Sequence, residues 1–177
     1  MMTELENSVW WLIESCRTGS SSPVSHISNL RKALLKLSED QFHSYTDSWE
    51  TTVNLLYSYK HWLAFNILLN NRCNEDRFDD CANTLMLYGR DTFFKVLNNP
   101  DDLADLDNFA GLERATLLFI NGWEDRYPGE ILPRGVDLDW AIKDYPVEMT
   151  DLAREQEIIE KQYPKLCKKY GKPTFDS

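Results

Sequence analysis

The chain has few cysteines, and none of them are spaced as a metal site requires. Its four cysteines are Cys16, Cys73, Cys81 and Cys167. Structural zinc sites use close pairs such as C-x-x-C, because two thiolates must reach one small ion from a rigid turn. Cys73 and Cys81 are too far apart in sequence for that pattern. A chain of 177 residues is also large enough to form a core without disulfides. We therefore expect reduced, mostly buried thiols and no cofactor.

Long apolar runs are missing as well. The longest ones, such as residues 115–120, fall far short of the ~20 residues that a membrane-spanning helix needs. The first residues, Met1-Met2-Thr3-Glu4, lack the basic and apolar regions of a secretory signal. With 42% hydrophobic residues and six tryptophans, the chain can form one substantial core. We therefore expect a cytoplasmic protein whose residues 1–177 form a single helical domain.

Basic residues are scarce compared with acidic ones. The chain holds 19 Lys and Arg against 29 Asp and Glu, which gives a formal net charge of -10. Most of the acid excess lies between Glu75 and Asp139. Such a field repels nucleic acids and anionic lipids and attracts basic surfaces. We expect no binding to nucleic acid or membrane, and a basic protein as the partner.

Strand patterns are poor, whereas helical patterns cover most of the chain. Apolar residues recur every three or four positions, and capping-box patterns occur at Thr3-x-x-Glu6 and Ser38-x-x-Gln41. Asn74 is a further candidate N-cap. The predicted fold is all-α or nearly so, a compact multi-helix domain. One long irregular segment is expected near residues 127–145, which contain two prolines and two glycines.

Common catalytic motifs are also missing. The sequence has no G-x-S-x-G, Walker, G-x-G-x-x-G or H-E-x-x-H motif, and His26, His43 and His61 lie within or beside helical patterns. We therefore expect that the protein is not an enzyme. An alternative is a small enzyme or metal-dependent protein that uses the Cys73, Glu75, Asp76 and Asp79 region. There, acids four residues apart share one face of a helix.

Acids that lie close to aromatic residues are the best candidates for partner binding. Tight interfaces bury aromatic anchors and surround them with charge that complements the partner. Trp140, inside the irregular segment, is the tryptophan that core packing explains least. The candidate partner-binding residues are Glu124, Asp125, Glu130, Asp137, Asp139, Trp140, Asp101, Asp102 and Asp105.

Several spaced motifs resemble a bacterial family of unknown function, domain-of-unknown-function family 4240. They are Trp62-Leu-Ala, residues 71–78 (NRCNEDRF), residues 85–90 (LMLYGR) and residues 98–104 (NNPDDLA). Residues 10–13, 127–133 and 163–166 also fit, so the resemblance spans nearly the whole chain. The family-signature residues are Trp62, Cys73, Asp76, Phe78, Gly89 and Arg90.

The chain departs from the family pattern in an informative place. Where members typically have Gly-Gly-Cys-Ser-Asp-Asp-Gly-Phe, this chain has Asn71-Arg-Cys-Asn-Glu-Asp-Arg-Phe78. The loss of the glycines and the serine argues against an active site there, whereas a helical binding protein tolerates such changes. The family implies no established activity, so the resemblance bears on the fold and leaves the function open.

By class, the small, acidic, single-domain chain without catalytic motifs resembles immunity proteins. We expect a cytoplasmic immunity protein that neutralises a basic toxin domain, most plausibly a nuclease from contact-dependent inhibition or another interbacterial system. An acidic surface can mimic the phosphates that a nuclease site binds. A third interpretation is an interaction protein unrelated to toxins.

Overall fold

A computed structural model describes residues 4–17, 23–107, 109, 115, 117–132, 136–144 and 152–172. Within these residues every regular element is a helix, and the one β-type pairing is an isolated bridge between Ser58 and Lys143. The all-α prediction is therefore confirmed. The elements are α1 (Glu4–Arg17), α2 (Pro23–Leu34), α3 (Glu39–Asn54), α4 (Tyr59–Leu68), α5 (Glu75–Met86), α6 (Arg90–Asn98), the 3-10 helix η1 (Pro100–Asp105), α8 (Leu118–Arg126), α9 (Leu152–Gln162) and α10 (Pro164–Tyr170).

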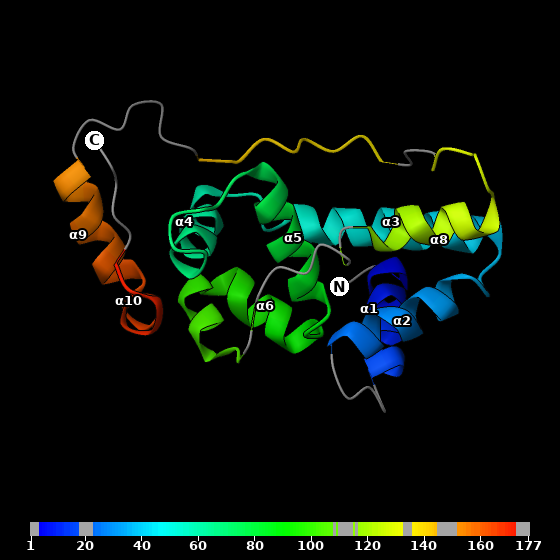
Figure 1. The fold of residues 1–177 in the computed structure, drawn as a ribbon, viewed down its shortest axis with the longest axis horizontal. Helices are drawn as coiled ribbons and strands as arrows, with labels where there is room; N and C mark the ends of the chain where they lie inside the picture. The colour runs from blue at the N-terminus through cyan, green and yellow to red at the C-terminus, as the bar shows by residue number, and fades with distance from the viewer. Residues whose placement is uncertain are drawn as a thin grey trace.

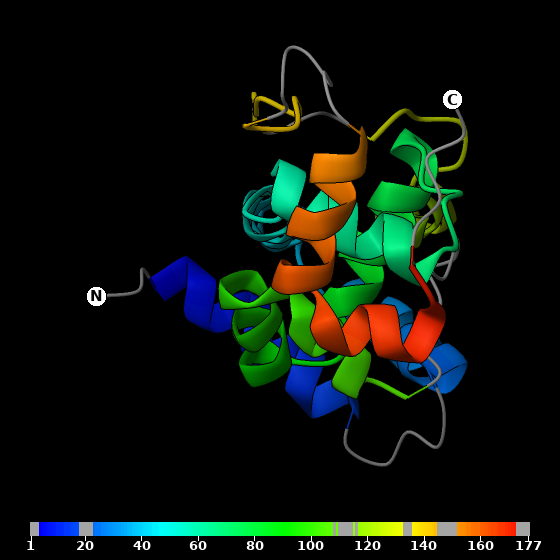
Figure 2. The same ribbon diagram turned by 90° about the vertical axis from the view of Figure 1, so that its left-hand side faces the viewer.

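The helices are spread along one long axis. Figure 1 shows α1 and α2 at one end, α4 to α6 in the middle, and α9 with α10 at the other end. Helix α1 packs on α2 and α3, α2 packs on α8, and α10 packs on η1 and α4. Figure 2 looks at the end where α9 and α10 lie across the molecule. Among the described residues, no helix is both long enough and apolar enough to cross a membrane.

Helix α3 begins at the predicted capping box. The Ser38 hydroxyl accepts from the Gln41 amide at 3.2 Å, and the Gln41 side chain accepts from the Ser38 amide at 2.9 Å. Its predicted aromatic stripe is buried: Phe42 and Trp49 contact Phe119 of α8 at ring distances of 6.3 and 5.1 Å. The predicted capping residue Thr3 lies outside the described residues.

Helices α4 and α5 form the middle of the core. Helix α4 is buried over most of its girth, as its apolar residues predict. The predicted N-cap of α5 is present, since the Asn74 side chain accepts from the Arg77 amide at 2.9 Å. Phe78, which is 1% exposed, packs against Trp62 of α4 at 5.6 Å and Phe65 at 5.3 Å.

Residues 136–144 form a strap along the end of α3. Helix α8 runs antiparallel to α3, and Arg126 at its end donates to the Leu37 carbonyl before α3 starts. The strap lies at the opposite end of α3, where the Asn54 side chain donates to the Asp139 carbonyl at 2.8 Å. Figure 1 shows this segment passing along the upper edge of the molecule. Residues 127–132 and 136–144 contain no helix, as predicted for the irregular segment.

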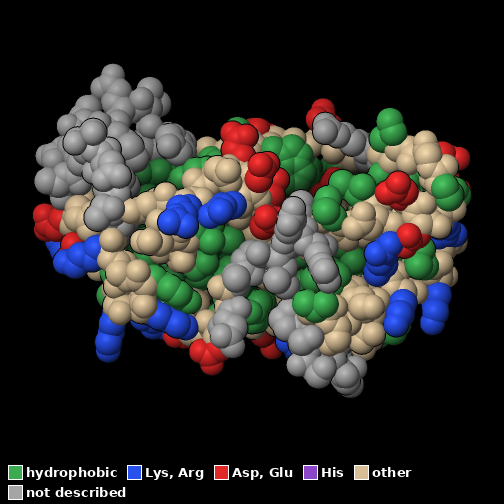
Figure 3. Space-filling model, viewed as in Figure 1, with side chains coloured by type: hydrophobic (Ala, Val, Ile, Leu, Met, Phe, Trp, Pro, Cys, Tyr) green, Lys and Arg blue, Asp and Glu red, His purple; other side chains and the backbone are tan. Residues whose placement is uncertain are grey.

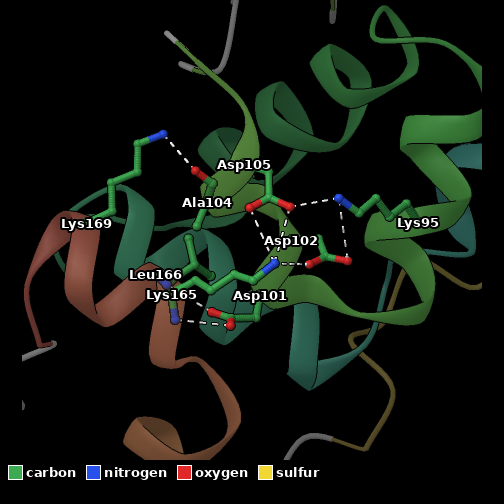
Figure 4. Close-up of polar contacts among 8 residues, drawn as sticks. All are labelled: Lys95, Asp101, Asp102, Ala104, Asp105, Lys165, Leu166 and Lys169. Atoms are coloured by element: carbon green, nitrogen blue, oxygen red, sulfur yellow. Dashed lines mark hydrogen bonds and ion pairs between the residues drawn. The ribbon is translucent and has the colours of Figure 1, made fainter.

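Helix α10 docks onto η1 through buried acids. Asp101 is 4% exposed, and its two carboxylate oxygens accept from the backbone amides of Lys165 and Leu166 at 3.1 and 2.9 Å. Asp102 is 8% exposed and accepts from the Lys165 ammonium at 2.6 Å (Figure 4). Asp101 and Asp102, predicted as partner-binding residues, are instead buried against α10. Both carboxylates bind groups within the fold. Asp101 accepts from two backbone amides at the start of α10 that have no partner within the helix, and Asp102 accepts from the Lys165 ammonium.

Candidate partner-binding surface

One tyrosine joins the strap to the start of α5. Tyr57 lies in the turn between α3 and α4 and is 6% exposed. Its ring contacts Phe78 of α5 at 4.8 Å and Trp140 of the strap at 4.9 Å, both edge to face. Its hydroxyl donates to the Asp79 carboxylate. Two acidic segments that lie some sixty residues apart in the sequence therefore meet at one side chain.

The strap is also fixed by its backbone. The Lys143 amide donates to the Tyr57 carbonyl at 3.1 Å, and the Tyr59 amide donates to the Lys143 carbonyl at 2.8 Å. Within the strap, the Asp139 carboxylate accepts from the Ala141 amide at 3.0 Å. These bonds satisfy backbone groups in a segment without helix or sheet. Trp140 is thus held at a defined place on the surface.

Asp79 is anchored from inside the core. Its backbone carbonyl accepts from the Asn83 side chain at 2.9 Å, and the Asn83 oxygen accepts from the indole of Trp49 at 2.7 Å. Its half-buried carboxylate has a raised pKa, first because burial disfavours the charged form and then because Asp80, Asp76 and Glu75 repel it. The Tyr57 hydrogen bond opposes that rise. Burial and the neighbouring Asp79 raise the pKa of Tyr57, so this phenol stays protonated.

We expect Asp79→Asn to leave the fold as stable as the wild type, or more stable, at neutral pH. The asparagine oxygen can accept the Tyr57 hydrogen bond without a desolvated charge. Because the folded-state pKa of Asp79 is raised, the folded protein binds more protons than the unfolded chain between the ordinary and the raised value. Stability contributed by Asp79 therefore falls as pH rises through that window, and the variant should lose this dependence.

Urea unfolding of both proteins from acidic to neutral pH measures this effect. Asp79→Ala is the control, since it removes the acceptor and should cost about 1–2 kcal/mol by leaving the Tyr57 hydroxyl unpaired. A loss of more than about 1 kcal/mol in Asp79→Asn at neutral pH would show that the charge itself stabilises the fold.

Acidic side chains gather around this junction. Residues 72–80 hold Glu75, Asp76, Asp79 and Asp80 against two arginines, and the strap holds Asp137, Asp139 and Asp144 against Lys143. Glu75 and Asp76 also lie in the first turn of α5, where the helix dipole favours negative charge. Figure 3 shows acidic side chains gathered over the start of α5, near the middle of the upper edge of this face.

The predicted partner-binding residues do not all lie on this surface. Asp137, Asp139 and Trp140 lie on the strap and are exposed, and Glu124 and Glu130 are exposed at α8 and just after it. Asp125 pairs with Arg31 of α2 at 2.5 Å. Asp105 pairs with Lys95 at 2.7 Å and Lys165 at 3.2 Å in the C-terminal cluster. The predicted set is thus divided among three regions of the molecule.

The family-signature residues have structural contacts that account for several of them. Trp62 stacks on Phe78 in the core. Gly89 has φ +88, a conformation that L side chains rarely adopt, and begins α6 beside Glu14 and Arg17 of α1. Arg90 lies over the Phe94 ring at 5.5 Å. Asp76 is exposed in the first turn of α5. The signature therefore spreads over the junctions of α4, α5 and α6.

The Cys73 region offers weak nucleophiles. Burial raises the pKa of the Cys73 thiol to about 12, although the Arg77 charge lowers it, so little thiolate forms at neutral pH. Burial lowers the pKa of His61 to about 4, and this histidine is 0% exposed inside the core. Among the described residues, no three His, Cys, Asp or Glu side chains come close enough to hold a metal ion.

Sequence reasoning missed Tyr57 and Asn83. Tyr57 lies between two helical patterns and Asn83 within one, and neither belongs to a recognised motif. Their role depends on contacts with residues more than twenty positions away. The sequence signal that does indicate this surface is the group of acids next to Trp140.

Comparison with known proteins gives one family. The chain matches the family described as "Protein of unknown function (DUF4240)" over residues 2–122. No curated protein and no solved structure matches it. The strap, α9 and α10 lie beyond the matched residues, so the resemblances at residues 127–133 and 163–166 are outside the match. Because the match covers more than half of the sequence, the chain belongs to the DUF4240 family of proteins of unknown function.

Proposed function

We propose that the protein binds a basic protein partner through the surface formed by the start of α5 and the strap. The observation that carries this proposal is the meeting of two acid-rich segments at Tyr57, beside an exposed tryptophan. Complementary charge speeds encounter and selects partners, and an aromatic anchor supplies contact area. The net charge of -10 favours the same class of partner.

The finer proposal is that the partner is a nuclease toxin domain and that the protein is its cytoplasmic immunity protein. A nuclease site is built to bind phosphates, and the carboxylates of the strap and of the start of α5 offer it the same sign of charge. The protein would then inhibit by covering the site. The test is to search the neighbouring genes for a basic toxin-like domain and to co-express it with this protein, which should restore growth; the absence of such a gene would count against the proposal. Continued growth arrest would contradict the toxin assignment.

We expect association with such a basic domain to be strongly salt dependent. The association rate should fall about tenfold between about 50 and 500 mM salt, because the Debye length shrinks from roughly 14 to 4 Å. Surface plasmon resonance with the purified protein measures both rates. A rate that does not change with salt would contradict an electrostatic interface.

A charge-matched pair of variants locates the surface. Replacing Asp137 and Asp139 together by asparagine should slow association several-fold with little change in dissociation, since exposed charges act mainly on encounter. Replacing Asp91 and Asp107 together by asparagine also removes two exposed charges, but at the start of α6 and just after η1. If both changes slow association equally, the partner does not bind at the strap, or only the net charge of the protein matters.

A further inference from the structure

We propose that the exposed indole of Trp140 is the anchor that receives an arginine side chain of the basic partner. This inference rests on the proposed function and names the chemistry of its central contact. Trp140 is 41% exposed, although it belongs to a segment with several fixed contacts. One part of the ring packs on Tyr57, and the exposed part remains open to a partner.

The anchor is rigid, which distinguishes it from an ordinary exposed tryptophan. Tyr57 holds the ring at 4.9 Å and 69°, and Asp79 in turn fixes the Tyr57 hydroxyl. On the strap itself, Asn54 binds the carbonyl of Asp139, the residue before Trp140. Because the ring is already ordered, a partner side chain that stacks on it loses little binding free energy to the entropy of ordering it.

The charges around the ring select a cation. Asp139 lies next to Trp140 in the chain, with its carboxylate oriented by the Ala141 amide at 3.0 Å. Asp79 lies on the other side of Tyr57, close to Asp80, Asp76 and Glu75. An aromatic face attracts a cation, and nearby carboxylates add to that attraction.

Arginine fits this arrangement better than lysine. The guanidinium is planar, so it can stack on the indole while its edge donates to a carboxylate. A lysine ammonium is more strongly hydrated and has no flat surface to stack. The strap therefore favours a partner that presents arginine at the centre of its basic surface.

A short oligo-arginine peptide is the probe, with an oligo-lysine peptide of equal length for comparison. We expect the arginine peptide to shift the Trp140 indole N–H signal in NMR spectra and to bind more tightly than the lysine peptide. Trp140→Ala should weaken arginine-peptide binding about tenfold. Trp140→Phe, which keeps an aromatic face, should lose less.

Trp11→Ala is the matched control, because Trp11 is an exposed tryptophan on α1 that is 68% exposed. Circular dichroism of each variant checks that the helices remain folded. Equal effects of the Trp11 and Trp140 changes, an unshifted Trp140 signal, or no peptide binding at all would overturn the inference. The proposed function fails separately, when the basic partner domain itself does not bind the wild-type protein.

Discussion

Replacing Asp101 by alanine is expected to lower the free energy of unfolding by about 3 kcal/mol. The carboxylate of Asp101 is buried and accepts from the first amides of α10, on Lys165 and Leu166 (Figure 4). Alanine removes both acceptors and leaves the Leu166 amide buried without them. Hydrogen bonds to a charged group contribute more than neutral ones, which sets the size of the loss.

Urea unfolding measures the change, and hydrogen exchange of the Leu166 amide reports on α10 itself. Asp101→Asn should lose less, because it retains one acceptor oxygen of the same shape. Asp107→Ala is the matched control, since Asp107 is 94% exposed and its ion pair with Lys169 spans 3.8 Å. That exposed pair should contribute little. A loss below about 0.5 kcal/mol in Asp101→Ala, or unchanged exchange at Leu166, would contradict the capping role.

The same aspartate shows where sequence reasoning stops. An N-cap that lies just before its helix, such as Ser38 or Asn74, can be recognised because the side chain and the amide are three residues apart. Asp101 caps a helix that begins more than sixty residues later, so nothing local marks it. Asp101 lies in the acid-rich stretch between Glu75 and Asp139, which predicts a surface role. Asp101 is instead buried by α10, and this tertiary contact cannot be read from the neighbouring sequence.

The candidate surface was partly predictable for a related reason. Trp140 stood out because it lies in a segment whose prolines and glycines exclude a helix, and its neighbours Asp137 and Asp139 are acids. The sequence could not place that segment beside the start of α5. That placement depends on Tyr57, whose two contacts join segments distant in the chain. Helical periodicity predicts which residues are buried, but not which helices meet.

The C-terminal helices add a further point about the family. The match ends at residue 122, whereas α10 docks onto η1, which lies inside it, and α9 packs on α10. Asp101 belongs to residues 98–104, which resemble a family motif. In this chain that motif residue holds α10, and Tyr163 adds a bond from its hydroxyl to the Lys60 carbonyl at 2.8 Å. The matched part of the chain therefore provides the docking site for the part beyond the match.

Gly89→Ala is the second change with a large expected effect, about 2–3 kcal/mol of destabilisation. Gly89 has φ +88 and ψ 170, a region that is essentially restricted to glycine. A Cβ added there would lie 2.2 Å from a carboxylate oxygen of Glu14 and 2.9 Å from a guanidinium nitrogen of Arg17. Those side chains pair with each other at 2.6 Å, and Arg17 also donates to the Tyr88 carbonyl at 2.7 Å. Both groups are the ends of half-exposed side chains that can move aside, so the added methyl group costs the backbone strain and about 1 kcal/mol more for the lost bond to Tyr88.

Gly171→Ala separates the two causes, because the control has the same backbone conformation without the crowding. Gly171 has φ 91 and ψ 170, and an added Cβ there meets nothing within 4 Å. It should cost only the backbone strain, about 1–2 kcal/mol. Combining Gly89→Ala with Glu14→Ala should recover part of the loss by removing the nearest atom. Thermal or urea unfolding of these variants gives the comparison. Equal losses at Gly89 and Gly171 would mean that backbone strain alone explains this signature glycine, and that α1 adjusts without cost.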